Sequence, residues 1–324
     1  MKIIELFTTY EYNIDDIVNG GGGLLKDIDV RINETLDFLI ENEAMLVDEL
    51  KTMLKSFKAE KAVMGYAFGK LCFWHYEAFV DCLNDDIYKV AAAIELLILS
   101  YDIIDDLQDK DTDYIWSETP ELSLNVALAM LIMSSRAIHD TSFEHKHLAV
   151  QLLEEYAFRS INGQQLDVLN ICRDEQSYLQ MIDRKSGSLT AMSCVIGEAL
   201  AKGKVSEEIE EYGKYIGIIQ QIKNDIISLK TWGPKNDLLN KKYSLPIIYL
   251  LAQKNSISNS VINYYNGYIV TLMDKNVIRD ELTNGGAIRY TITIKNLHKL
   301  KALNILENVA INKVGKEYLI KLMK

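Results

Sequence analysis

The sequence predicts an all-α protein built around one large helical domain. Its 324 residues include only 3 prolines and 17 glycines, so few positions force a helix to end. Hydrophobic residues make up 48% and charged residues 25% of the chain, a balance that can bury a core. Apolar residues also recur at helical spacing over most of the length. A β-sandwich would need turn residues far more often.

The first break along the chain is Asn19 followed by Gly20 to Gly23. Four consecutive glycines favour a flexible joint. The segment lacks the Lys-Ser/Thr pair of a phosphate-binding loop, so a joint is the better interpretation. We therefore expect residues 1–23 to form an N-terminal arm and residues 24–324 to form the main domain.

Helical patterns follow one another after this joint. The apolar positions that define the first of them are Ile32, Leu36, Leu39, Ile40, Val90, Ile94, Leu97 and Ile98, and further runs cover residues 122–138, 189–200 and 215–229. This spacing is typical of helices that face a core. Only residues 289–294, which follow Gly285 and Gly286, alternate between polar and apolar side chains as a strand does. They predict a small β appendage over about residues 284–294.

The net charge, the cysteines and the absence of a targeting signal indicate which partners and which cellular compartment to expect. A net charge of −11 disfavours nucleic acid, because phosphate binding needs clustered Lys and Arg. The four cysteines show no CxxC spacing, which indicates reduced thiols in a cytoplasmic protein. Glu5 interrupts the N-terminus before any signal-peptide core. The charge-free stretch 255–273 is too polar to cross a bilayer, so we expect no membrane span.

The most informative segment is an acidic stripe after the apolar run 90–99. At 100° per residue, four carboxylates fall within an arc of about 100° on one helix face; they belong to Asp102, Asp105, Asp106 and Asp109. A solvated acidic face is one interpretation. Because the preceding run predicts a buried helix, and buried like charges need compensation, a divalent cation site is the better one. Mg²⁺ suits carboxylates that share an ion with a substrate phosphate.

A second helix carries a polar stripe of the same width. Its members, which also span about 100° of arc, are Gly217, Gln221, Asn224, Asp225 and Ser228. Residues 163–167 (GQQLD) and Lys185-Ser186-Gly187 lie between the two stripes in sequence. Lys185 can supply positive charge to a diphosphate. Each of these short segments alone would more often be an exposed surface sequence without a function. Their occurrence together in this order is what indicates a functional site.

These motifs in this order resemble the trans-polyprenyl diphosphate synthases, the all-helical class I isoprenoid synthases, over about residues 30–260. The family's motifs DDxxD, GQxxD, K-T-G, GxxFQxxDDxxD and K-x-T-L-P are matched by residues 105–109, 163–167, 185–187, 217–228 and 242–246. The resemblance implies a single-domain helical bundle around a central cavity. It also implies a homodimer, and an allylic diphosphate held by three Mg²⁺ ions.

The resemblance assigns roles residue by residue. The implied metal ligands are Asp105, Asp106, Asp109, Asn224, Asp225 and Ser228. The implied catalytic groups are Asp105, Asp106, Asp109, Lys185, Gln221 and Asp225, and the implied substrate contacts are Lys70, Tyr101, Asp102, Gln164, Asp167, Ser186 and Lys242. Tyr101 lies where a bulky residue shortens the product in the family, which implies a geranyl or farnesyl chain. Core packing is its other interpretation.

The sequence departs from the family where isopentenyl diphosphate would bind. Phe73 replaces an expected Arg, Ile98 replaces an expected His, and no Arg pair follows Asp109. Charge-assisted contacts are each worth about 1.5–3 kcal/mol, so ordinary chain elongation is disfavoured. The second DDxxD is also altered, because Asn224 and Ser228 stand where carboxylates are expected.

Within the family, the pattern is most similar to the ComQ-type enzymes, which transfer a prenyl group to a Trp of a quorum-sensing pre-peptide. Our leading hypothesis is therefore a Mg²⁺-dependent prenyltransferase with a small Trp-containing peptide as acceptor. A terpene cyclase is the alternative, although the Glu of its metal motif would fall on Trp232. An elongating short-chain synthase comes third, and a catalytically silent regulatory subunit is the non-enzymatic alternative. Trp74 and Trp116 are candidates for an acceptor pocket or for the core.

Overall fold

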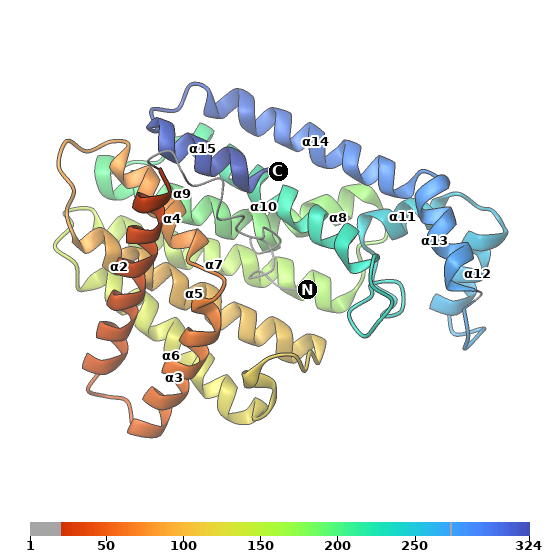
Figure 1. Ribbon diagram of the computed structural model, residues 1–324, viewed down its shortest axis with the longest axis horizontal. Helices are drawn as coiled ribbons and strands as arrows, with labels where there is room; N and C mark the ends of the chain where they lie inside the picture. Colours follow the sequence, from red (N-terminus) through yellow and green to blue (C-terminus); the bar gives the residue numbers. More distant parts are fainter. Residues whose placement is uncertain (1–20, 273) are drawn as a thin grey trace.

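A computed structural model of the protein (Figure 1) describes residues 21–272 and 274–324. This part of the chain is helical and contains no strand, which confirms the predicted all-α class. The α-helices are α2 (Gly21–Asn42), α3 (Asp48–Ala62), α4 (Ala67–Glu77), α5 (Asp86–Asp109), α6 (Pro120–His139), α7 (Lys146–Leu169), α8 (Glu175–Ile182), α9 (Ser188–Lys202), α10 (Glu207–Ser228), α11 (Leu245–Ala252), α12 (Ser256–Tyr265), α13 (Lys275–Asn284), α14 (Ala287–Leu306) and α15 (Lys313–Leu322). A 3₁₀ turn, η2 (Ile115–Ser117), and a π-helical turn, η3 (Asp183–Gly187), complete the set.

Two largely buried helices form the centre of the bundle. Helix α5 packs against α2, α4 and α6, and α9 packs against α4, α7 and α10. Residues 90–103 of α5 are all buried, the charged Glu95 and Asp102 among them, and most of the other residues are apolar, as expected for a core helix. Helix α14 runs along α10 at one edge of the molecule (Figure 1). The acidic end of α5 therefore projects from the middle of the core.

The predicted joint lies at the boundary of the described residues. Residues 1–20, including Asn19 and Gly20, are outside them. Gly21 to Gly23 form the first turn of α2, so the helix begins within the glycine run. The division into an arm over 1–23 and a domain over 24–324 stays a prediction.

The prediction of a β appendage over residues 284–294 was wrong. Gly285 and Gly286 separate α13 from α14, and Gly286 has the left-handed φ of 96° that favours glycine. The alternating segment then continues as α14, in which the hydroxyls of Thr291 and Thr293 donate to the carbonyls four residues earlier. Strand propensity of β-branched residues is context-dependent, and packing along α10 overrides it.

Helix α6 is the one described helix with the length and apolar composition of a membrane span. It packs along α5 and also contacts α3 and α7, and residues such as Val126 and Met130 are buried. Its opposite face exposes Leu124, Leu128 and Ile132, which lie on one side of a helix at successive turns. An exposed apolar stripe of this kind is typical of an interaction surface.

Candidate active site

Carboxylates gather at the C-terminal end of α5. Asp105 and Asp106 are buried, and the helix ends directly after Asp109, where Lys110 takes a left-handed φ of 57°. The C-terminal end of a helix carries partial negative charge, so acidic side chains there are electrostatically unfavourable. Cations from other elements must compensate them.

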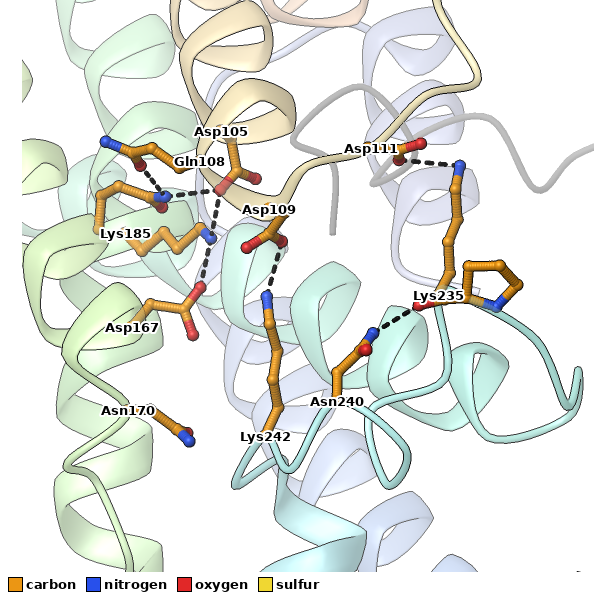
Figure 2. Close-up of polar contacts among 12 residues, drawn as sticks. Asp105, Gln108, Asp109, Asp111, Asp167, Asn170, Lys185, Lys235, Asn240 and Lys242 are labelled. Atoms are coloured by element: carbon orange, nitrogen blue, oxygen red, sulfur yellow. Dashed lines mark hydrogen bonds and ion pairs between the residues drawn. The ribbon is translucent and has the colours of Figure 1, made fainter. Parts of the chain in front are cut away.

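Lys185 of η3 provides the first of these cations (Figure 2). Its Nζ lies 3.2 Å from Oδ1 of Asp105 and 2.6 Å from Oδ2 of Asp167. Burial alone would lower the pKa of Lys185, but the two carboxylates outweigh it and raise that pKa above its usual value. Gln164 joins the group by donating to Asp105 (2.6 Å) and to Gln108 (2.8 Å). The DDxxD, GQxxD and Lys-Ser-Gly segments thus meet in one cluster.

Two glycines allow Lys185 to reach this position. A Cβ on Gly163 of α7 would lie 2.2 Å from the backbone nitrogen of Lys185, and a Cβ on Gly217 of α10 would lie 2.3 Å from the carbonyl oxygen of Ser186. Both distances are shorter than any real Cβ contact. Ser160 reinforces the approach by donating to the carbonyl of Lys185 (2.9 Å). The π-helical turn is therefore clamped between α7 and α10, and π turns are frequent at functional sites.

The loop between α10 and α11 supplies two more cations (Figure 2). Nζ of Lys242 lies 2.6 Å from Oδ2 of Asp109. Nζ of Lys235 lies 3.0 Å from Asp111 and 2.5 Å from Asp113. Each of these lysines thus bridges this loop to the end of α5 or to the segment just after it.

The second polar stripe forms the α10 side of the site. The Ser186 hydroxyl donates to Gln221 (2.9 Å), and Gln221 donates to Asp225 (3.2 Å). Tyr178 and the backbone of Leu245 also donate to Asp225. Burial, followed by the charge of Asp237, raises the pKa of Asp225 to about 8.

The other two residues of this altered motif are less central. Asn224 is buried, and its Nδ2 has no hydrogen-bond partner. The Ser228 hydroxyl donates to the carbonyl of Asp225 (2.9 Å). Their assignment as metal ligands stays a prediction.

Three predicted substrate contacts are buried and have neighbours other than Lys185 and Lys242. Lys70 is buried and bound to both carboxylate oxygens of Asp29, at 2.6 and 2.7 Å. Asp102 is buried beside Lys61 (3.9 Å). Tyr101 is buried in the core of α5, and burial raises its pKa. The assignment of these three residues as substrate contacts stays a prediction.

The two tryptophan candidates are core residues. Trp74 packs edge-on against Phe73, and its indole nitrogen has no hydrogen-bond partner. Trp116 stacks on Tyr114 with ring centroids 4.7 Å apart, and its Nε1 donates to Oδ2 of Asp106 (2.8 Å). Trp116 therefore contacts the site from its buried side.

Sequence reasoning missed three residues of the site, namely Tyr178, Lys235 and Asp237, and it named Trp116 only as a candidate for an acceptor pocket or for the core. All four residues lie outside the matched motifs. Lys235 and Asp237 are in a loop, where no periodicity marks a residue as buried or facing the site. Their closeness to the Lys242 motif in sequence was the one available signal.

The donor chemistry of the site fits Mg²⁺. Within residues 21–272 and 274–324, no three His, Cys, Asp or Glu side chains form a ready-made metal cluster. Mg²⁺ does not require one, because it keeps several waters and uses one or two carboxylates together with substrate phosphates. Hard oxygen donors are present on α5 and on α10, and the buried Asp237 has an oxygen without a hydrogen-bond partner.

Comparison with known proteins identifies the class. A family model described as polyprenyl synthetase matches residues 67–267, which is more than half of the chain. The chain belongs to the polyprenyl synthetase family and is a prenyltransferase. The family that the motifs predicted is confirmed.

Individual relatives of high similarity share one name. The chain is 36% identical to "Tryptophan prenyltransferase ComQ" of Bacillus subtilis subsp. natto (strain BEST195), over 83% of this chain and 84% of the relative. It is 30% identical to the protein of that name from Bacillus subtilis (strain 168), over 83% and 90%. A polyprenyl synthase from Caulobacter crescentus CB15, solved with calcium and isoprenyl diphosphate, shares the fold with a TM-score of 0.77 at 18% identity, over 96% of each chain.

Proposed function

We propose that the protein is a Mg²⁺-dependent prenyltransferase that takes a short allylic diphosphate, geranyl or farnesyl, and transfers its prenyl group to a Trp of a small peptide. One observation carries the choice against isopentenyl diphosphate. Lys70, which would contact that second diphosphate in the synthases, is buried and neutralised by Asp29. Because Phe73 and Ile98 occupy the other expected contacts, none of these three positions offers a free cation to a second diphosphate.

The allylic diphosphate has a better binding region between α5 and the α10–α11 loop. Lys185 and Lys242 are two buried or half-buried cations of this region, and both already bind carboxylates. Asp105, Asp106 and Asp109 on one side and Asp225 on the other would hold Mg²⁺, which neutralises the leaving group. Binding of the metal and diphosphate would exchange carboxylate–lysine pairs for carboxylate–metal and lysine–phosphate contacts.

The reaction then follows from charge stabilisation. The carbon–oxygen bond of the allylic substrate breaks, and its electron pair leaves with the diphosphate. Lys185 and Lys242 stabilise that developing negative charge from fixed positions. The indole ring of the acceptor supplies the electron pair for the new bond and afterwards loses a proton, for which the released diphosphate is an available base.

We further propose that two copies associate through the exposed apolar stripe of α6. Leu128 and Ile132 are 57% and 70% exposed, and Phe158 of the neighbouring α7 is 68% exposed. Burial of such side chains contributes roughly 1.5–3 kcal/mol each. The stripe lies on the side of α6 that faces away from the core.

Mass spectrometry of the products tests the proposed reaction. The protein is incubated with geranyl or farnesyl diphosphate, Mg²⁺ and a small Trp-containing peptide, with and without isopentenyl diphosphate. We expect a peptide that gains the mass of one prenyl group, and no gain in a peptide whose Trp is changed to Phe.

The alternatives give different products. Consumption of isopentenyl diphosphate would identify an elongating synthase, and a cyclic hydrocarbon would identify a terpene cyclase. No turnover with any acceptor would support a silent subunit. The Asp105→Asn variant is the matched control, because turnover that persists without this carboxylate would contradict metal-assisted ionisation at this site.

A further inference from the structure

Asp225 and Asp237 form a pair of buried carboxylates beside the lysine cluster. Asp225 lies on α10, and Asp237 follows in the loop that leads to α11. Both are at most 4% exposed. Neither forms an ion pair in the described part of the chain, and the charge of Asp237 is the main electrostatic influence on Asp225 after burial. Two adjacent buried carboxylates without a cation are costly.

The pair borders a small cavity of about 30 Å³. Asp225, Asp237 and Ser244 all line it, and two buried atoms at its wall, Oδ2 of Asp237 and Oγ of Ser244, have no hydrogen-bond partner. A cavity needs roughly 10–15 Å³ to hold one water. This one has room for an ion with a retained water, and buried unsatisfied oxygens call for such an occupant.

The charges around the cavity also call for a cation. Asp167 and Lys242 complete its charged lining, so three carboxylates face one ammonium there. That ammonium binds Asp109 at 2.6 Å, and Asp167 is bound by Lys185. Lys242 also acts on Asp237, but it is already paired with Asp109, and no cation of the described residues forms an ion pair with Asp225 or Asp237.

We infer that Asp237 joins Asp225 as a carboxylate ligand of a Mg²⁺ ion that binds together with the diphosphate. This inference rests on the proposed function and deepens it. It explains how the α10 side binds metal although Asn224 and Ser228 stand where carboxylates were expected. Two carboxylates, retained waters and phosphate oxygens are a normal coordination set for Mg²⁺.

Isothermal titration calorimetry with inorganic pyrophosphate and Mg²⁺ tests the inference without relying on turnover. Asp237→Asn should weaken binding at least about tenfold, as loss of even an outer-shell contact does in metal sites, and Asp225→Asn should do the same. Asp280→Asn, on the exposed surface of α13, is the matched control and should bind like the wild type. Pyrophosphate without Mg²⁺ should show no difference between Asp237→Asn and the control.

A metal count gives the second readout. With Mn²⁺ as a spectroscopic substitute and pyrophosphate present, electron paramagnetic resonance should show one fewer bound ion in Asp237→Asn than in the wild type. Without metal this variant should be at least as thermally stable as the wild type, because a buried charge is removed. Asp237→Ser provides an independent variant with the same expected binding loss if Asp237→Asn folds poorly.

The outcomes separate the inference from the proposed function. Wild-type binding of Mg²⁺ and pyrophosphate with an unchanged affinity and metal count in Asp237→Asn would overturn the role of Asp237 alone. A wild-type protein that binds no Mg²⁺ and pyrophosphate would overturn both.

Discussion

The indole nitrogen of Trp116 donates a 2.8 Å hydrogen bond to Oδ2 of Asp106, the second carboxylate of the DDxxD motif. Trp116 is fully buried, stacked on Tyr114 and packed edge-on against Phe57. An aromatic side chain held this firmly fixes the direction of the carboxylate that it binds. The order of the site therefore depends on a residue that contacts Asp106 from within the core.

Replacing Trp116 by Phe should reduce turnover by about tenfold or more, the scale seen when partners that orient metal ligands are removed. The lost hydrogen bond to a charged group should also cost about 1.5–3 kcal/mol of stability. Steady-state kinetics at varied Mg²⁺ would show a raised metal requirement. Trp74→Phe is the control, because its indole nitrogen has no partner, and its turnover should stay at the wild-type level. Equal losses in both variants would contradict a positioning role.

Replacing Lys185 by Met should destabilise the metal-free protein by about 3–5 kcal/mol, because it leaves the buried Asp105 and the half-buried Asp167 without their shared cation. Mg²⁺ should restore part of this loss by neutralising the same carboxylates. Urea unfolding with and without Mg²⁺ measures both effects. Lys235→Met removes a lysine whose side chain is 43% exposed and should cost about 0–1 kcal/mol. A Lys185→Met protein as stable as Lys235→Met would be evidence against the buried pairing.

Helical spacing predicted the all-α class, and the family resemblance implied one site for Asp105, Gln164 and Lys185, which do contact one another. Sequence patterns failed at residues 289–294, where the choice between strand and helix is made by contact with α10 and not by local preference. Sequence patterns also missed Asp237, because a loop has no helical or strand periodicity that would mark one of its residues as buried. Lys70 shows a third limit, because a residue can keep its place in a motif while an ion pair with Asp29 changes its environment.

Replacing Gly163 by Ala should disrupt the site through the backbone. Its new Cβ would lie 2.2 Å from the nitrogen and 2.6 Å from the Cα of Lys185, so α7 and η3 must separate. Overpacking commonly costs about 1–3 kcal/mol, and we expect the upper end of that range with a loss of pyrophosphate binding. Gly233→Ala is the control, because nothing lies within 4 Å of its added Cβ. Thermal unfolding and calorimetry would check both variants, and a neutral Gly163→Ala would refute the clamp.

His75 should make the protein sensitive to acid. It is fully buried, its Nδ1 lies 2.6 Å from the carbonyl oxygen of Leu71, and Nε2 is bound by the Tyr212 hydroxyl. Burial lowers the pKa of His75 to about 4 from 6.5, although Leu71 and Glu198 act in the opposite direction. Between about pH 6.5 and pH 4, His75 therefore binds a proton in the unfolded chain but not in the folded protein. The free energy of unfolding decreases as pH falls through this range. The loss amounts to roughly 3 kcal/mol.

Unfolding free energies measured between pH 7 and pH 4 test this dependence. His75→Gln carries no titrating group and should have a shallower loss of stability in acid than the wild type. His139→Gln alters an exposed histidine and should follow the wild-type curve. An identical acid profile for His75→Gln and the wild type would show that His75 is not the group responsible.

Replacing Leu128 and Ile132 by Glu should convert the proposed dimer into a monomer. These side chains are 57% and 70% exposed on the outer face of α6, so the change should leave the bundle itself folded, and two buried charges facing their symmetry mates would oppose association. Sedimentation equilibrium should give twice the chain mass for the wild type and the single mass for the variant. Val270→Glu, at an exposed position outside α6, is the matched control.

Because α6 also has the composition of a membrane span, flotation with lipid vesicles belongs in the same experiment. A wild type that floats with vesicles and remains monomeric without them would replace the dimer by a membrane contact.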